Sequence, residues 1–161
     1  MAVKAYTGIL GTPIQSSWEN ARIMCSKDGK DVKAELPAPL SKIENDWFLN
    51  WASGLHVFDF WLGIKNDPFS NGIIDLGVGY LVNQHGSPHT WSNWQSNEPN
   101  WHSETLLNDP SNVFDPSCVW SSGDVEGDPF YGWADDLCTS GRNVLCTHVL
   151  CKAYFLIKIF I

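Results

Sequence analysis

The sequence predicts an α+β fold in one domain, because two helical patterns come first and short strands follow around a long irregular segment. The chain has 161 residues, 43% of them hydrophobic, which is enough to bury a single core. Its five cysteines are widely separated, which suits disulfide bridges formed in an oxidising compartment. We therefore expect one extracellular domain stapled by disulfides.

The first helix is predicted from Ser16, which has Glu19 three residues further on, the spacing of a capping box. The apolar residues that follow recur at helical spacing, and the pattern stops at Gly29. They are Trp18, Ala21 and Cys25. This face carries Cys25 into the core.

A second helix is predicted to begin at Ser41, again with a Glu three residues on, and to end near Gly54. Its apolar face is expected to consist of Ile43, Trp47 and Trp51.

From Phe58 on, the pattern changes to the alternation of a half-buried strand, which runs toward a turn at Asn66–Pro68. The alternating residues are Phe60, Leu62 and Ile64. Further strands are predicted at Cys118–Ser121, Tyr131–Ala134 and Asn143–Val149. We expect both helices to pack on one side of the sheet.

The segment from Phe69 to Asp115 is rich in Gly, Asn, Ser, Pro and Trp and shows no sustained periodicity. A loop of this length inside a compact domain is usually functional or disordered. Its aromatic residues favour an ordered, functional loop.

The charge balance, 18 acidic against 10 basic residues and a net charge of -8, makes nucleic acid and anionic membranes poor partners. Metal cations and neutral ligands suit this surface better.

No secretory signal is visible at the start of the chain. The predicted domain covers residues 1–149, and an apolar tail, residues 150–161, follows. The tail is too short to span a bilayer, so we expect no membrane span within this chain, and it is either a last strand or the stub of an anchor.

Five segments, in order along the chain, resemble a C-type lectin-like domain. They are Ser17–Arg22 (SWENAR), Glu44–Leu49 (ENDWFL), Phe60–Ile64 (FWLGI), Asn93–Asn100 (NWQSNEPN) and Trp133–Cys138 (WADDLC). The fourth is similar to the family's N-W-x-x-x-E-P-N stretch, and the fifth lies where the family has W-N-D-x-x-C. The agreement runs roughly from Tyr6 to Val149. The resemblance implies two helices, antiparallel sheets and a long loop that binds calcium and sugar.

The resemblance also implies two disulfides, Cys25 with Cys146 and Cys118 with Cys138. Cys151 falls outside this pattern and is either an unpaired buried thiol or the site of a disulfide-linked oligomer. A zinc site of Cys138, Cys146, His148 and Cys151 is the other use of these residues, although the spacing matches no common zinc finger.

For metal and ligand binding, the resemblance implies four residues: Glu98, Asn100, Glu104 and Asp135. Glu98 and Asn100 flank Pro99 and offer hard oxygen donors, which Ca²⁺ selects. In the family this proline is cis and directs both side chains at one metal, which two neighbouring sugar hydroxyls ligate directly. The E-P-N form implies mannose, fucose or N-acetylglucosamine type ligands.

Two features depart from the family pattern. Ala134 stands where the family has an Asn that ligates calcium and donates to the sugar, so one ligand is missing. Asp136 either compensates for it through a shift of the loop or is a solvated acidic side chain.

The segment after Asn100 is longer than the family usually has, so Asp109 or Asp115 could replace Glu104 as a ligand. Trp101 either stacks on a sugar ring or anchors the loop.

The predicted function is calcium-dependent binding of glycans or glycoproteins outside the cell. The alternative is a lectin-like domain that has lost calcium and recognises a protein ligand, and Ala134 motivates it. Acidic residues could pair as in a glycosidase: Asp124, Glu126, Asp128, Asp135 and Asp136. No nucleophile–base or phosphate-loop spacing accompanies them, so we expect a binding domain and no enzyme.

Overall fold

The computed structural model describes residues 2–5, 14–28, 34–66, 81–100, 117–122 and 131–148. Two helices, α1 (Trp18–Asp28) and α2 (Lys42–Gly54), are joined to short strands, mostly antiparallel. The strands are β1 (Ala2–Ala5), β2 (Gln15–Ser16), β3 (Ala34–Glu35), β4 (Phe60–Asn66), β5 (Leu81–Asn83), β6 (Ser117–Ser122), β7 (Gly132–Leu137), β8 (Arg142–Asn143) and β9 (Leu145–His148). The predicted α+β class is confirmed.

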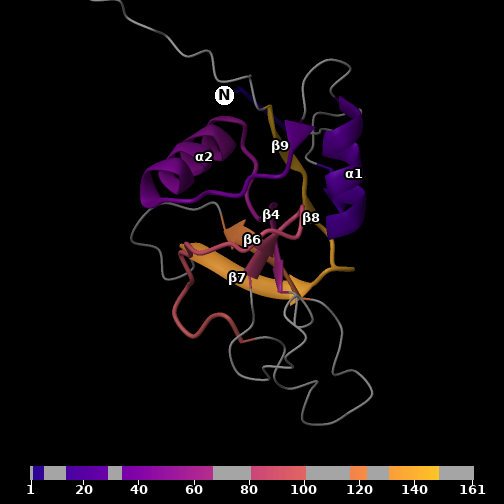
Figure 1. The fold of residues 1–161 in the computed structure, drawn as a ribbon. Coiled ribbons are helices and arrows are strands. Elements are labelled where there is room, and N and C mark those ends of the chain that lie inside the picture. The colour runs from indigo at the N-terminus through magenta and orange to yellow at the C-terminus, as the bar shows by residue number, and fades with distance from the viewer. Residues whose placement is uncertain are drawn as a thin grey trace, which may run out of the picture.

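The strands form two sheets (Figure 1). The smaller has the order β1-β9-β3 and is antiparallel throughout. The larger has the order β2-β8-β4-β6-β7, with β5 also paired to β4. Among the described strands, β4 and β8 are its one parallel pair. Because β8 and β9 follow one another, the end of the domain joins the two sheets.

Helix α1 buries the predicted face, but its start differs from the prediction. The buried residues are Trp18, Ala21 and Cys25. Ser16 lies in β2, and the helix begins two residues later. The Glu19 carboxylate accepts a hydrogen bond from Arg22 Nε at 2.9 Å. The predicted capping box is therefore wrong.

Helix α2 begins as predicted and buries a different face. Ser41 is its N-cap, and the Ser41 hydroxyl accepts a hydrogen bond from the backbone N–H of Glu44. The buried residues are Asn45, Phe48, Leu49 and Ala52. Ile43 is 83% exposed and Trp51 43% exposed, because both lie on the other side of the helix from this face. The predicted apolar face was therefore wrong.

The exposed apolar side of α2 is hollowed by a groove of about 270 Å³. Its lining residues are Trp47, Asn50, Trp51, Gly54 and Leu55. The Trp47 and Trp51 rings lie 5.8 Å apart along it.

Strand β4 lies between two hydrophobic cores, so it is buried on both faces. The disulfide core consists of Trp18, Ala21, Cys25, Ala34, Leu36, Trp61, Cys118, Val144 and Cys146. The Trp133 core consists of Leu49, Ala52, Val57, Phe60, Leu62, Ile64, Val119, Trp133 and Leu145. Successive side chains of a strand point to opposite faces, which places Trp61 in the first core and its neighbours in the second.

Helix α1 contributes to the disulfide core and α2 to the Trp133 core. The helices therefore lie on opposite sides of β4 (Figure 1), and the expectations of a half-buried strand and of helices on one side were wrong.

Two disulfides connect Cys25 to Cys146 and Cys118 to Cys138, the pairs that the resemblance implied. Because Cys138 and Cys146 are bonded in this way, the zinc site is wrong. Cys151 and the tail lie outside the described residues, as does most of the segment between Phe69 and Asp115.

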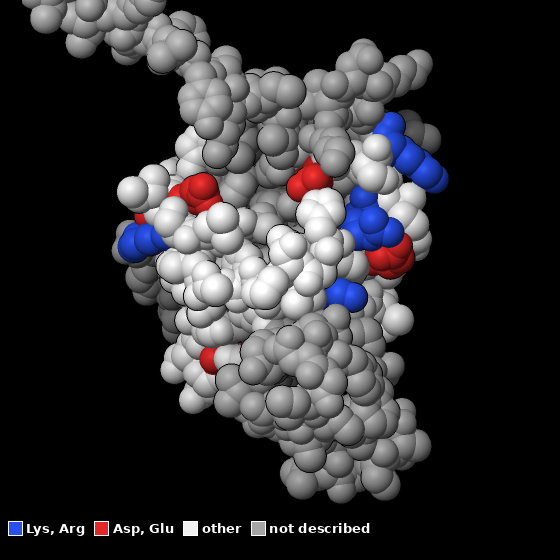
Figure 2. All heavy atoms as spheres, viewed as in Figure 1, with Lys and Arg blue, Asp and Glu red and all other residues white. Residues whose placement is uncertain are grey.

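None of the helices in the described part of the chain is long and apolar enough to cross a membrane. On the face shown in Figure 2, the described charged side chains are scattered singly or in small groups and form no large patch of either sign.

Candidate functional site

The candidate site lies where the segment before Asn100 meets β7. Trp133 connects the two, since its backbone N–H donates to the Asn93 carbonyl at 2.7 Å and its carbonyl accepts from the Gln95 N–H at 2.9 Å. Gly132 permits this close approach: it has φ 133°, and a Cβ there would lie 2.7 Å from the Asn93 oxygen. The Gln95 side chain also donates to the Ser122 hydroxyl at 2.8 Å.

The Trp133 ring is the centre of the packing beneath the site. It is fully buried, and its Nε1 donates to Asn45 Oδ1 of α2 at 2.9 Å. The Trp91 and Trp94 rings meet it edge-on, with centroids 5.1 and 6.0 Å away. One aromatic side chain thus connects α2, β7 and the segment that leads to Glu98.

Glu98, Asn100 and Asp135 come together at this point. The Asn100 N–H donates to Asp135 Oδ1 at 2.9 Å and to Glu98 Oε2 at 3.1 Å. The Asn100 amide Nδ2 donates to Glu98 Oε1 at 3.1 Å. The Glu98–Pro99 peptide bond is cis, as in the family. Three of the four residues implied by the resemblance therefore lie within hydrogen-bonding distance of one another.

The surroundings of Glu98 act on its carboxylate. Burial raises the pKa of Glu98, and so do the hydrogen bond and the negative charge of Asp135. Asp135 is 6% exposed, whereas Asn100 is exposed and Glu98 is half-buried. The site thus concentrates negative charge at the edge of the fold, which a cation would neutralise.

The oxygen donors at the site suit a hard cation such as Ca²⁺. Two carboxylates and one amide nevertheless supply fewer side-chain oxygens than the six to eight that calcium usually takes. Within the described ranges, no three His, Cys, Asp or Glu side chains gather in one place. Glu104, Asp109, Asp115 and Trp101 lie outside the described residues.

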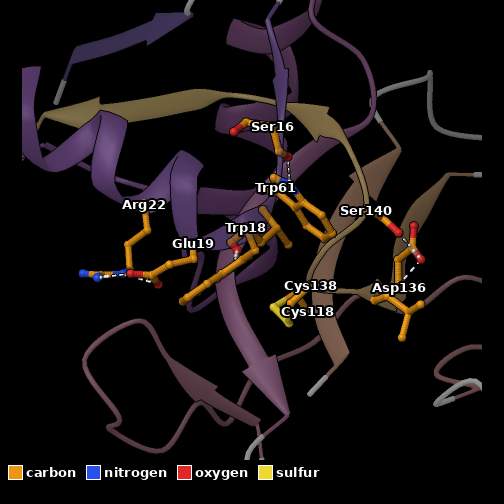
Figure 3. The surroundings of a disulfide bond; sticks show 11 residues. Ser16, Trp18, Glu19, Arg22, Trp61, Cys118, Asp136, Cys138 and Ser140 are labelled. Carbon is orange, nitrogen blue, oxygen red and sulfur yellow. Dashed lines mark hydrogen bonds and ion pairs between the residues drawn. A yellow bond between two sulfur atoms is a disulfide. The ribbon is translucent and has the colours of Figure 1, made fainter. Parts of the chain in front are cut away.

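Ala134 and Asp136 flank Asp135 and do not add to the site. Ala134 is buried. Asp136 accepts hydrogen bonds from the Ser140 hydroxyl at 2.9 Å and from Arg142. Figure 3 shows Asp136 beside Ser140, in the surroundings of the Cys118–Cys138 disulfide. Asp136 therefore neither compensates for Ala134 nor is a solvated acid: the half-buried Arg142 is its partner.

His89 belongs to the surroundings of the site and was missed by sequence reasoning. Its side chain is 6% exposed, and its ring lies 6.0 Å from that of Trp133. A histidine next to a Pro and a Thr in a loop gives no sequence signal of such burial.

Comparisons with known proteins identify the family of this chain. A model of the C-type lectin domain (Lectin C-type domain) matches residues 14–148. Among curated protein sequences, none matches the chain with significance.

Solved structures share the fold at low identity. The carbohydrate-recognition domain of mouse scavenger receptor C-type lectin is 18% identical, with a TM-score of 0.58, and the match covers 91% of this chain and 89% of that one. The C-type lectin CEL-I from Cucumaria echinata is 15% identical (TM-score 0.61; 89% and 86% covered). The herring type II antifreeze protein is 18% identical (TM-score 0.55; 83% and 84% covered). With the family model matching most of its length, the chain belongs to the C-type lectin domain family.

Proposed function

We propose that this chain is an extracellular, calcium-dependent carbohydrate-binding domain and that it is not an enzyme. The observation that carries the proposal is the convergence of Glu98, Asn100 and Asp135, in which one backbone N–H bonds both carboxylates. Two disulfides in the structure support an oxidising compartment.

Calcium would be held by Glu98, Asn100 and Asp135, with Glu104 proposed as a further ligand. When bound, calcium offers coordination positions that two neighbouring sugar hydroxyls can occupy. The role of this chain's own residues is to orient those hydroxyls: Glu98 accepts hydrogen bonds from them, and the Asn100 amide donates. The proposed ligands are glycans of the mannose, fucose or N-acetylglucosamine type, because the segment is Glu-Pro-Asn.

Ala134 sets the expected strength of binding. Its methyl group cannot supply the amide that the family places there, and a lost polar partner typically costs about 1 to 3 kcal/mol, or one to two decades of affinity. We therefore expect a weak site, near the millimolar end of the range for extracellular calcium modules.

A second candidate is a domain that binds a protein partner without calcium, which the buried Ala134 favours. The same fold occurs in a herring antifreeze protein, so the fold supports uses other than sugar recognition. In that case Cys151 would join two copies of the chain through a disulfide. A gel run with and without reductant would show the joined copies only without it.

The test is a calcium titration of the full chain, followed by tryptophan fluorescence, with mannose or galactose present. We expect saturation near millimolar calcium and tightening by mannose alone. Glu98→Gln and Asp135→Asn should each weaken calcium binding at least about tenfold, because each replaces a buried or half-buried charged ligand with a neutral one. Ala134→Asn should strengthen it about tenfold to a hundredfold.

Asp136→Asn is the matched control, because Asp136 lies in the same strand but bonds Arg142 and Ser140. Its calcium affinity should equal that of the unchanged chain. No response up to about 10 mM calcium, well above the usual range for such sites, would reject the proposal and favour the protein-binding alternative.

A further inference from the structure

His89 is a buried imidazole whose position is fixed by the backbone. It follows a tight turn in which Asn83 Oδ1 accepts hydrogen bonds from two backbone N–H groups, at 2.9 and 3.1 Å. The His89 N–H donates to the Leu81 carbonyl at 2.8 Å. With its main chain anchored to β5 in this way, the buried side chain lies beside the Trp133 ring.

The surroundings of the imidazole favour its neutral form. Its Nε2 is buried and has no hydrogen-bond partner within the described part of the chain. Burial lowers the pKa of His89, while the carbonyls of Pro39 and Trp91 and the Glu44 carboxylate act in the opposite direction and do not outweigh it. Glu44 is the charged group that acts on the ring from α2, whereas β7 presents the uncharged Trp133 ring.

Protonation of His89 is therefore linked to the stability of this core. Its folded-state pKa lies below the ordinary value of 6.5, so the unfolded chain takes up the proton first as the pH falls. The neutral His89 imidazole contributes fully to the free energy of unfolding above pH 6.5, and this contribution is lost as the pH falls below 6.5. The loss ends once the pH is below the folded-state pKa.

Residues 89–98 connect this imidazole to the candidate site in an unbroken series of contacts. The Trp91 ring packs on Trp133, and the Asn93 and Gln95 backbones bond the Trp133 backbone. The Glu98 N–H then donates to the Gln95 carbonyl at 3.1 Å. Moving His89 into water would therefore pull on the segment that brings Glu98 to Asp135.

We propose that His89 is a pH-sensitive contact: when its imidazole gains a proton, residues 88–100 separate from the Trp133 core, and Glu98 and Asn100 move away from Asp135. The consequence for ligands, release of metal and sugar in mild acid, rests on the proposed function. The separation itself does not.

The first experiment follows the tryptophan indole N–H signals by NMR from about pH 8 to pH 5, in EDTA. The Trp133 signal, which reports the bond to Asn45, should change near the titration of His89. Trp18 and Trp61 belong to the disulfide core. The Trp18 indole donates to the Leu62 carbonyl and the Trp61 indole to the Ser16 carbonyl, and the signals of both should not change in the same spectrum.

His89→Leu should abolish the change at Trp133, and His89→Gln is a second neutral variant in case leucine disturbs the fold. His85→Gln is the matched control: it removes a histidine from the same turn whose side chain is 56% exposed, and the Trp133 change should persist. A Trp133 signal that is constant over this range, or one that still changes in both neutral His89 variants, would overturn the proposal.

A second experiment measures calcium affinity at about pH 7.5 and pH 5.5. The unchanged chain should bind several-fold more weakly at the lower pH, and His89→Leu should lose most of this difference. The effect should stay below about tenfold, because uptake of one proton by a group whose pKa lies below 6.5 cannot weaken binding further over this range. Absence of calcium binding at both values rejects the proposed function alone, because the EDTA experiment still decides whether His89 controls the segment.

Discussion

The disulfide core and the Trp133 core lie side by side in one small fold but are stabilised in different ways. Both disulfides contact the first core, through Cys25, Cys118 and Cys146 within it and Cys138 packed against it. The second core depends on aromatic packing and on hydrogen bonds of Trp133. The candidate site is attached to the second core.

This difference separates the stability of the chain from the geometry of its site. Covalent bridges act mainly on the unfolded ensemble and do not respond to small changes in pH. Aromatic contacts and single hydrogen bonds can be lost locally while the rest of the fold persists. We therefore expect the site to respond to conditions that leave the disulfide core intact.

The largest effect is expected when Cys25 and Cys146 are both replaced by alanine. This bridge spans 121 residues, and the chain-entropy model assigns it about 5 kcal/mol of unfolding free energy. The bridge of Cys118 and Cys138 spans 20 residues and is assigned about 3 kcal/mol. Denaturant unfolding of the two double variants measures this difference, and equal losses would contradict the entropic account.

A smaller but more selective effect is expected for Trp133→Phe. The substitution leaves the Asn45 oxygen without its donor, at a cost of about 1 to 3 kcal/mol, and loosens the segment before Glu98. Trp61→Phe is the control, since Trp61 donates to the Ser16 carbonyl from the disulfide core. Both variants should lose stability, but only Trp133→Phe should weaken calcium binding. Equal losses of calcium affinity would mean that the two cores are not separable.

The smallest effect is expected at Asp46, on the rim of the Trp133 core. Its carboxylate accepts hydrogen bonds from Lys42 at 2.8 Å and from Tyr131 at 3.1 Å, and these partners, Lys42 first, lower the pKa of Asp46. Because the folded-state pKa is lowered, the stabilisation is present above the ordinary value of 3.8 and is lost as the pH falls through the folded-state pKa.

Asp46→Asn should therefore cost less than about 1 kcal/mol at neutral pH, as is usual for exposed pairs. Thermal unfolding at several pH values would show the difference from the unchanged chain shrinking below pH 3.8. A difference that stays constant as the pH falls well below 3.8, where the unfolded chain takes up the proton first, would contradict this assignment.

The ordered motifs were sufficient to predict the fold class. They also predicted that Glu98, Asn100 and Asp135 lie together. The buried face of α2 could not be predicted in the same way, because the helix has two apolar sides. Tertiary packing selects the side with Phe48 and Leu49. It also buries the polar Asn45, which a hydrophobicity pattern would place outside, because the Trp133 indole requires an acceptor.

Strand β4 shows a related limit of sequence patterns. Alternation of Phe60, Leu62 and Ile64 indicates one buried face, but Trp61 between them is also fully buried. An indole can lie on a surface or in a core, and only the arrival of α1 on the second face decides between them. The burial of His89 depends in the same way on a neighbour, Trp133, that is distant in sequence.

The two disulfides are nested, since Cys118 and Cys138 both lie between Cys25 and Cys146 in the sequence. A protease that cuts the chain once anywhere between Cys25 and Cys146 therefore releases no separate fragment, because the outer bridge still joins the two pieces. A single cut between Asn100 and Ser117 would thus leave both pieces joined by the outer bridge. Such a cut would be visible only after the bridges are reduced.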